Sequence, residues 1–314
     1  MIYVGIDLGG TNIAAGVVDE NGKLVAKKSI PTGADRPAEA ILKDMAMVAI
    51  AVVEENGYSM DDVVSVGIGS PGSVNKEKGE LVYANNLPFS KTPMRAELQK
   101  YINKPIYIDN DANCAAWAEA MAGATKGVED SIAITLGTGV GGGIVVNGKL
   151  YSGFNFVGGE LGHTVIAVDG EPCSCGRKGC WEAYASATAL IRQTKAAAEA
   201  DKDSKMWDYY KKDGKFSGRT AFNAARDGDK AAQSVVDNYV KYVGCGVADM
   251  INIFQPEVLV IGGGVANEGE ALLQPIRDYV ATQVYSREGI GKTRIERAFL
   301  GNDAGIIGAA LLKE

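Results

Sequence analysis

The chain has 314 residues, 46% hydrophobic and 23% charged, which is typical of a globular protein long enough for two domains. Its formal net charge of −7 argues against broad binding to nucleic acids or anionic membranes, because both require a positively charged surface. No apolar run reaches 18 residues, so we expect no membrane span. The N-terminal stretch MIYVGIDLGG lacks the features of a signal peptide, and we predict a cytoplasmic protein with reduced thiols.

The first third of the chain alternates between short apolar strands and helical patterns. Glycine-containing turns separate the first three apolar runs, and two later runs end in polar residues. Strands are predicted at 2–7, 13–19, 24–30, within 62–72 and at 104–111, with helices at 37–56 and 112–124. This order of elements predicts an α/β fold.

The chain then repeats itself. The segment IDLGGTNIAAGVVDENGKL (6–24) lines up with ITLGTGVGGGIVVNGKL (134–150), and both end in Asn-Gly-Lys-Leu. A match of this length indicates duplication, so each half should open with a β-hairpin that has a glycine-rich turn. Two similar α/β lobes predict a ligand cleft between them.

After residue 185 the sequence becomes mainly helical. Helices are predicted at 185–200 and 221–254, and the polar stretch between them is interpreted as a solvated loop or helix edge without chemistry. A strand with a glycine loop follows at 256–264, and a helix at 304–313 ends the chain.

The glycine turns indicate phosphate binding. Two segments match G-x-G-x-x-G, but neither is followed by a helix, so neither predicts a dinucleotide site. Turns without side chains let backbone N–H groups approach phosphate oxygens, and an aspartate beside them predicts a bridging Mg²⁺. In the alternative interpretation the glycines only make turns and Asp7 caps a strand. The residues predicted to hold ATP and Mg²⁺ are Asp7, Gly9, Gly10, Thr11, Asn12, Gly137, Thr138, Gly139, Gly263 and Gly264.

Two aspartates mark the end of the strand at 104–111. Asp109, Asn110 and Asp111 lie where the strand turns into a helix, the position at which α/β folds bind ligands. One aspartate could simply cap the helix. One that faces a cleft could accept the proton of a hydroxyl attacking a γ-phosphate. The chain has a single histidine, next to a cysteine cluster, so no Ser/His/Asp triad is available.

The cysteine cluster predicts a metal site. His163, Cys173, Cys175 and Cys180 form a complete tetrahedral set for Zn²⁺, which leaves no open position and makes the site structural. The alternatives are buried free cysteines or a redox pair. Glu160 and Glu182 flank the cluster, where they either accept hydrogen bonds from sugar hydroxyls or face solvent.

Four motifs together identify a family. DLGGTN, NDAN, GELGH and CSCGRKGCWE closely resemble the bacterial ROK family (repressors, open reading frames, kinases), especially its glucokinases, from residue 2 to the C-terminus. The resemblance implies a duplicated actin/hexokinase-like (ribonuclease H-like) fold, with ATP and sugar bound between two lobes. It implies that Asp111 is the base that activates the sugar 6-hydroxyl and that His163 binds both zinc and sugar. The implied sugar-binding residues are Gly69, Asn86, Asn110, Asp111, Glu160, His163 and Glu182.

The expected protein is therefore an ATP-dependent glucokinase with Mg²⁺ and structural Zn²⁺, forming homodimers or homotetramers. The smaller lobe is predicted at 1–112 plus 303–314, and the larger at 113–302. Alternatives are a kinase for N-acetylmannosamine, N-acetylglucosamine, fructose or allose, or a sugar-sensing repressor. The repressor is disfavoured because the first strand begins at Ile2, which leaves no room for the N-terminal helix-turn-helix that such repressors carry. Cys175→Ser is expected to lower the affinity for sugar or the stability far more than it affects nucleotide binding.

Overall fold

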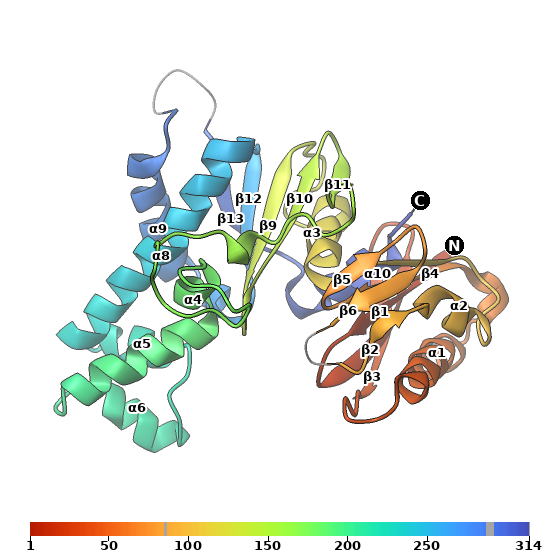
Figure 1. The fold of residues 1–314 in the computed structure, drawn as a ribbon, viewed down its shortest axis with the longest axis horizontal. Helices are drawn as coiled ribbons and strands as arrows, with labels where there is room; N and C mark the ends of the chain where they lie inside the picture. The colour runs from red at the N-terminus through yellow and green to blue at the C-terminus, as the bar shows by residue number, and fades with distance from the viewer. Residues whose placement is uncertain (85–86, 287–291, 314) are drawn as a thin grey trace. The chain divides into compact units, whose positions relative to one another are not determined.

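The computed structural model describes residues 1–84, 87–286 and 292–313. Strands and helices alternate along the described chain, and its strands form two five-stranded sheets and a small three-stranded one. The predicted α/β class is confirmed (Figure 1).

The chain divides into two compact units. The first comprises Met1–Ala133, Gly143–Gly159 and Phe299–Glu314, and the second comprises Ile134–Gly142 and Glu160–Ala298. The predicted lobe boundary after residue 112 would instead separate the helix that begins at Asp111 from the first unit. That helix packs closely against the C-terminal helix, which explains why the first unit includes it.

The first unit is built on a mixed five-stranded sheet. In spatial order its strands are β3 (Leu24–Pro31), β2 (Asn12–Asp19), β1 (Ile2–Leu8), β4 (Val63–Ser70) and β8 (Ile106–Asn110). β1, β2 and β3 pair antiparallel, as the glycine and Asn-Gly turns predict, whereas β4 and β8 continue the sheet in parallel with β1. The carboxyl ends of β1, β4 and β8 therefore meet at one edge of the sheet.

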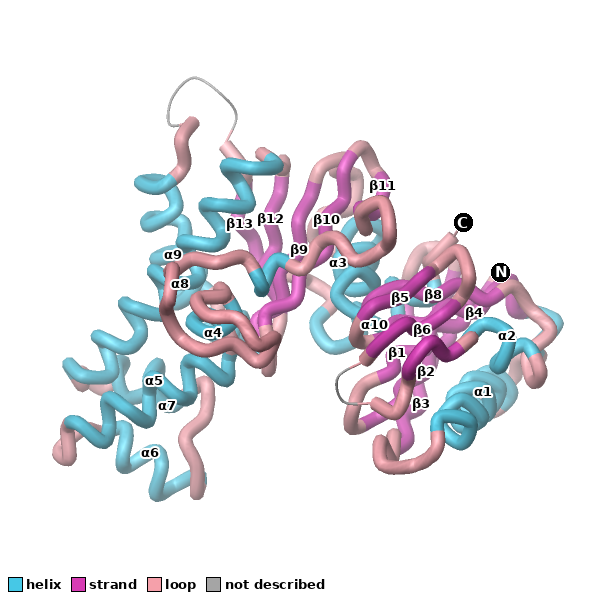
Figure 2. Tube along the Cα trace, in the orientation of Figure 1, coloured by secondary structure: helices cyan, strands magenta, loops and turns pink. Residues whose placement is uncertain are grey.

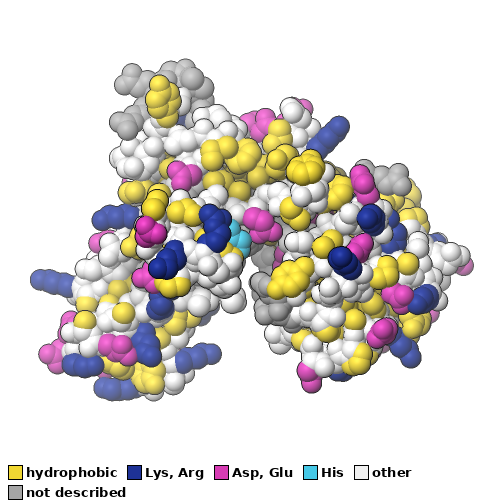
Figure 3. Space-filling model, in the orientation of Figure 1, with side chains coloured by type: hydrophobic (Ala, Val, Ile, Leu, Met, Phe, Trp, Pro, Cys, Tyr) yellow, Lys and Arg dark blue, Asp and Glu magenta, His cyan; other side chains and the backbone are white. Residues whose placement is uncertain are grey.

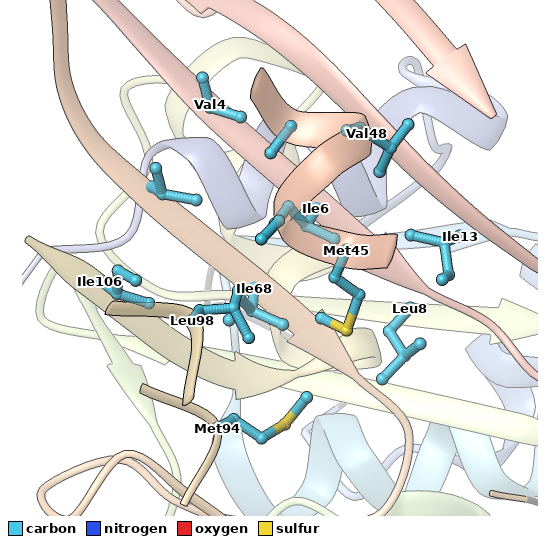
Figure 4. Close-up of a cluster of buried hydrophobic side chains, with 14 of the residues drawn as sticks. Val4, Ile6, Leu8, Ile13, Met45, Val48, Ile68, Met94, Leu98 and Ile106 are labelled. Carbon is cyan, nitrogen blue, oxygen red and sulfur yellow. The ribbon is translucent and has the colours of Figure 1, made fainter. Parts of the chain in front are cut away.

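Helices cover both faces of this sheet. One face carries α1 (Ala38–Glu54) and α2 (Met94–Gln99), and the other carries α3 (Asp111–Ala122) and α10 (Ala304–Ala310). Apolar residues on α1 recur at helical spacing, so one side of the helix is buried. In Figure 4, Met45 of α1 lies among Ile6, Leu8 and Ile68 of the sheet. These side chains are completely buried, and truncating one to alanine typically costs about 2–5 kcal/mol.

Two glycines let α10 approach the other face closely. A Cβ on Gly5 of β1 would lie 1.9 Å from the carbonyl oxygen of Ile306, and a Cβ on Gly67 of β4 would lie 1.7 Å from that of Ala309. The contacts are with backbone atoms, which cannot move aside. The packing of the C-terminal helix thus depends on the missing side chains.

The second five-stranded sheet repeats the order of the first. Its strands are β11 (Lys149–Tyr151), β10 (Val140–Val146), β9 (Ser131–Leu136), β12 (Val258–Gly262) and β13 (Arg294–Arg297). β9 and β10 occupy the places that β1 and β2 hold in the first sheet, as the repeated sequence requires. β12 and β13 are parallel, like β4 and β8. The predicted duplication is confirmed.

The second unit is rich in helices. They are α4 (Glu182–Ala185), α5 (Ala187–Ala200), α6 (Met206–Asp213), α7 (Thr220–Arg226), α8 (Lys230–Phe254) and α9 (Glu270–Gln283). The polar stretch predicted as a loop or helix edge contains α6, because Met206 supplies a buried anchor. The single helix predicted at 221–254 is two helices, since the Asp229 side chain accepts from the Ala232 N–H and starts α8 anew.

The sequence did not predict the smallest elements. A three-stranded sheet is formed by β5 (Ser73–Asn75), β6 (Glu80–Tyr83) and β7 (Ser90–Thr92). Short 3₁₀ turns lie at Met60–Asp62, Leu161–His163, Gly264–Glu268 and Gly301–Asp303. Strands of three or four residues are too short to leave a periodic pattern.

Charges of both signs are interspersed over the face drawn in Figure 3, with no broad patch of one sign. None of the helices in the described ranges combines the length and the apolar character that crossing a membrane requires.

Candidate active site and metal centre

The parallel strands of the first unit bring the predicted catalytic residues together. Asp7 at the end of β1 pairs with Gly69 of β4, and Gly69 pairs with Asp109 of β8. Asn110 and Asp111 follow directly, where β8 ends and α3 begins. The carboxyl edge of the sheet therefore holds Asp7, Gly69 and Asp111 side by side in the first unit, as expected for an α/β ligand site.

The surroundings of Asp7 and Asp111 disfavour the charged form of both carboxylates. Burial, and then the negative charge of Asp111, raises the pKa of Asp7 from 3.8 to about 6. Burial also raises the pKa of Asp111, although hydrogen bonds from the backbone at Ala112 and from Asn110 partly oppose the shift. In the part of the chain that the structure describes, neither has an ion-pair partner. Such a pair suits a divalent cation or a proton-donating hydroxyl.

Asp109 is chemically different from Asp111. One of its oxygens accepts from the Asn110 N–H at 2.8 Å and from the Asn113 side chain at 2.8 Å. The other lies 3.5 Å from the ammonium of Lys76, which also donates to the Ser152 hydroxyl at 2.8 Å. Because a cation and two donors already contact Asp109, this carboxylate has a structural role.

Asn110, not an aspartate, caps the helix. Its side-chain oxygen accepts from the N–H groups of Ala112 at 2.8 Å and Asn113 at 3.3 Å, and its amide donates to the Gly72 carbonyl at 3.2 Å. The alternative interpretation, in which an aspartate caps α3, is therefore wrong. The cap fixes the first turn of α3, and this turn carries Asp111.

The first glycine turn connects β1 to β2. The Gly9 N–H donates to the Asn12 carbonyl at 2.9 Å, and Thr32 holds the turn from behind. The Thr32 hydroxyl donates to the Gly9 carbonyl at 2.6 Å, and its N–H donates to the Thr11 carbonyl at 2.9 Å. Gly10, Thr11 and Asn12 are exposed, so this turn can present its backbone to a ligand.

The second glycine turn connects β9 to β10 in the second unit. It is closed by a 3.0 Å hydrogen bond from the Gly137 N–H to the Gly139 carbonyl. Gly263 lies beside it at the end of β12, with a left-handed φ of 85°, and a Cβ there would be 2.4 Å from the Leu136 carbonyl oxygen. The neighbouring strands β9 and β12 thus bring together the glycines predicted to bind the nucleotide in this unit: Gly137, Gly139, Gly263 and Gly264.

The four predicted metal ligands meet in a long loop. Between β11 and α4 the chain is drawn almost entirely as loop in Figure 2. Gly176 and Gly179 adopt φ angles of 85° and 77°, which turn the chain sharply at the cysteines. The ligand atoms of His163, Cys173, Cys175 and Cys180 all lie within 4.8 Å of one another.

Their geometry fits Zn²⁺. The Cys173 sulfur is 3.6 Å from His163 Nδ1, and the sulfurs of Cys175 and Cys180 are 3.7 Å apart. Zinc–sulfur bonds of about 2.3 Å at tetrahedral angles place two sulfurs about 3.8 Å apart. Nδ1 is the histidine nitrogen that faces the cluster, so Nε2 is the nitrogen left for another partner.

The cluster needs a cation. Burial raises the pKa of the Cys180 thiol to about 12, so this sulfur is a thiolate at neutral pH only beside a metal. The five cysteines form no disulfide. The Arg177 guanidinium donates to the His163 carbonyl at 3.3 Å, which keeps a positive charge near the three sulfurs. These residues would hold a structural Zn²⁺ with four protein ligands.

Glu182 contacts protein groups at both of its oxygens. Oε2 accepts from the Val140 N–H at 3.0 Å, and Oε1 accepts from the Ser174 hydroxyl at 3.1 Å. Glu160 is exposed and begins the short turn that contains His163. The two glutamates that the sequence paired as sugar ligands therefore have different surroundings.

The predicted sugar-binding residues belong to both units. Gly69, Asn110 and Asp111 lie in the first, whereas Glu160, His163 and Glu182 lie in the second. Asn86 lies outside the described residues. Sequence reasoning missed four supporting residues: Thr32, Lys76, Ser174 and Thr188, whose hydroxyl donates to the Thr138 carbonyl at 2.8 Å. Only Ser174, placed between two cysteine ligands, gave a positional signal.

Comparison with known proteins places the whole chain in one family. The model of the ROK family matches residues 3–314. The chain belongs to the ROK family.

Several ROK proteins are similar over nearly the full chain. A glucokinase of Halalkalibacterium halodurans is 38% identical, with 99% of this chain and 94% of the relative aligned. The crystal structure of a ROK glucokinase from Streptomyces griseus in complex with glucose and AMPPNP is 37% identical, with a TM-score of 0.84 over 99% of this chain and 98% of that one. A xylose repressor of Caldicellulosiruptor bescii is 30% identical over 88% of this chain and 69% of the repressor. The hexokinase-like fold expected of a ROK protein is confirmed.

Proposed function

We propose that this ROK protein is a glucokinase that transfers the γ-phosphoryl group of ATP to the 6-hydroxyl of D-glucose. The products are glucose 6-phosphate, ADP and a proton. The similarity to glucokinases over 94% or more of their length supports this activity, and so does a similar solved glucokinase that binds glucose and AMPPNP.

One observation carries the proposal: Asp111 is a half-buried carboxylate without a cationic partner among the described residues, and it is fixed on the first turn of a capped helix. A raised pKa makes it a better proton acceptor than an exposed aspartate. Asp111 accepts the proton of the sugar hydroxyl as its oxygen attacks the γ-phosphorus. Asp109 cannot do this equally well, because Lys76 occupies it.

The glycine turns bind the nucleotide. Their backbone N–H groups contact phosphate oxygens, and Thr11 and Thr138 add hydroxyls. Asp7 would hold Mg²⁺, which neutralises phosphate charge when bound. Asn12 stands where the family commonly has a lysine, so this turn offers hydrogen bonds but no positive charge. The raised pKa of Asp7 supports the assignment, since a cation removes the cost of its buried charge.

The remaining sugar contacts are assigned by resemblance. Glu160 accepts hydrogen bonds from sugar hydroxyls, and His163 reaches the sugar with Nε2 while Nδ1 faces zinc. Gly69, Asn86, Asn110 and Glu182 complete the proposed set. The exposed carboxylate of Glu160 and the orientation of the His163 ring support these roles.

A panel of sugars tests the proposed substrate. ADP release is coupled to NADH oxidation with glucose, mannose, fructose, allose, N-acetylglucosamine and N-acetylmannosamine as acceptors. We expect the highest kcat/KM with glucose. A higher kcat/KM for another hexose would change the proposed substrate but leave the proposed kinase activity in place. Absence of hexose-dependent ADP release with every sugar would contradict the proposal and favour a sugar-binding regulator.

The enzyme is proposed to work in the cytoplasm, where ATP is available and thiols stay reduced for zinc. Its assembly into homodimers or homotetramers stays a prediction, which sedimentation velocity would test.

A further inference from the structure

Glu182 links the metal loop to the second glycine turn. It lies two residues after the zinc ligand Cys180, at the start of α4. Its Oε2 accepts from the N–H of Val140, the residue that follows the turn, at 3.0 Å. Its Oε1 accepts from the hydroxyl of Ser174, which stands between two zinc ligands, at 3.1 Å. The Cys173 sulfur lies 3.8 Å from the same oxygen.

The fit between Glu182 and the turn is tight. A Cβ on Gly139 would lie 2.2 Å from Glu182 Oε2, so only glycine allows this carboxylate to approach. The glycine that the sequence assigns to phosphate contact is therefore also required by a protein contact.

The chain that follows Glu182 donates two more hydrogen bonds to the same turn. At the start of α5, the Ala187 N–H donates to the Gly137 carbonyl at 2.8 Å. The Thr188 hydroxyl donates to the Thr138 carbonyl at 2.8 Å. Segment 182–188 thus fixes three consecutive peptide groups of the turn, and zinc anchors the start of that segment through Cys180.

We propose that Glu182 is a positioning residue through which the zinc loop holds the nucleotide-binding turn, so that the metal site supports nucleotide affinity as well as the sugar site. The inference rests on the proposed function, because it requires Gly137–Gly139 to bind nucleotide phosphates. The turn can present its free N–H groups only in the conformation that Glu182 and α5 impose. Without the carboxylate, the turn must be ordered by the nucleotide itself, at the expense of affinity.

The test measures the binding of MgADP by calorimetry without sugar. The zinc-loaded proteins are the wild type, Glu182→Gln, Ser174→Ala and the control Glu171→Gln. Glu171 is a carboxylate of the same loop, and its side chain pairs with Arg192 at 3.5 Å rather than with a group of the turn. Bound zinc and the melting temperature are measured for each protein, so a loss of metal or fold is seen separately.

We expect Glu182→Gln to bind MgADP about tenfold more weakly, because it weakens a hydrogen bond that has a charged acceptor. Ser174→Ala, which removes only the link to the loop, should weaken binding about two- to fivefold. Glu171→Gln should bind like the wild type. If Glu182→Gln does not fold, the MgADP affinity of Ser174→Ala, a change at an exposed position, tests the inference instead.

A second arm removes zinc with a chelator. The wild type should then lose affinity for MgADP. Glu182→Gln should lose little further affinity on zinc removal, because the substitution and the chelator both break the same link between the zinc loop and the turn. MgADP affinities within twofold of the wild type for both Glu182→Gln and Ser174→Ala would overturn the inference. A wild type that does not bind MgADP at all would instead overturn the proposed function.

Discussion

The two glycine turns have similar sequences and equivalent places in similar sheets, but their supports differ. The turn at Gly9–Asn12 is held by the backbone and hydroxyl of one threonine, Thr32. The turn at Gly137–Val140 is held by a carboxylate, a hydroxyl and a backbone N–H from segment 182–188. The two halves therefore share their strand order, whereas segment 182–188, which follows the metal loop, supports only the second turn.

The two halves also differ in where they hold negative charge. The first places the half-buried carboxylates of Asp7 and Asp111 at the edge of its sheet, whereas the residue that aligns with Asp7 in the second is Thr135. Under the proposed function, the general base and the Mg²⁺ ligand therefore belong to the first unit. The predictions below separate this catalytic role from the supporting roles.

The largest effect is expected for Asp111→Asn. Loss of the general base should lower kcat by about 10²–10⁴-fold with little change in the affinity for glucose. The control is Asp109→Asn, two residues away. It breaks the contact with Lys76, so it should lower the melting temperature but reduce kcat far less than Asp111→Asn does. Equal losses of kcat in both variants would remove the distinction between the two carboxylates.

Gly5→Ala tests the frame of the first unit. The added Cβ meets the Ile306 carbonyl oxygen at 1.9 Å, so the free energy of unfolding in urea should fall by about 3 kcal/mol. Gly137→Ala is the counterpart in the second unit. No atom lies within 4 Å of its added Cβ, so its stability should change by less than about 0.5 kcal/mol. A stable Gly5→Ala protein would contradict the close packing of α10.

Asp7→Asn should stabilise the metal-free protein above pH 7. The folded-state pKa of about 6 exceeds the ordinary value of 3.8, so the charged carboxylate disfavours folding at high pH and the penalty is relieved as pH falls through 6. We expect a gain of about 1–2 kcal/mol in unfolding free energy at pH 8, vanishing by pH 4. A gain that grows toward low pH would have the wrong sign.

The smallest effects concern the two supporting hydroxyls. Thr32→Val and Thr188→Val each remove one hydrogen bond to a turn carbonyl, which typically costs about 0.5–1.5 kcal/mol. Thermal unfolding with and without a zinc chelator checks both variants. Zinc removal should weaken MgADP binding by the same factor in Thr32→Val as in the wild type, because this threonine supports the turn that zinc does not reach. A smaller factor in Thr32→Val would link the first turn to the metal.

The parts of the fold and site that the sequence predicted are those with local determinants. Glycine and Asn-Gly turns specify the two hairpins, and the spacing of one histidine and three cysteines specifies a tetrahedral ligand set. Each of these two signals lies within about twenty residues. The role of Asp111 as the base stays a prediction, which came from resemblance combined with its place at a strand end.

Contacts between distant residues could not be predicted. Lys76 meets Asp109 and Ser152 across separations of 33 and 76 residues, and Glu182 meets Val140 across 42. No periodicity or spacing marks such pairs. The choice of Asn110 over its aspartate neighbours as the helix cap likewise depends on where β8 ends, a boundary that a sequence pattern locates only to within a few residues.

The central claim is transfer of a phosphoryl group from ATP to the 6-hydroxyl of glucose, and ³¹P NMR tests it most directly. The purified zinc-loaded protein is mixed with MgATP and either glucose or 6-deoxyglucose, which lacks only the accepting hydroxyl. We predict a glucose 6-phosphate signal that grows in step with ADP in the first sample, and ATP that stays intact in the second. Equal ADP formation with both sugars, or a phosphate ester at another carbon, would contradict the account.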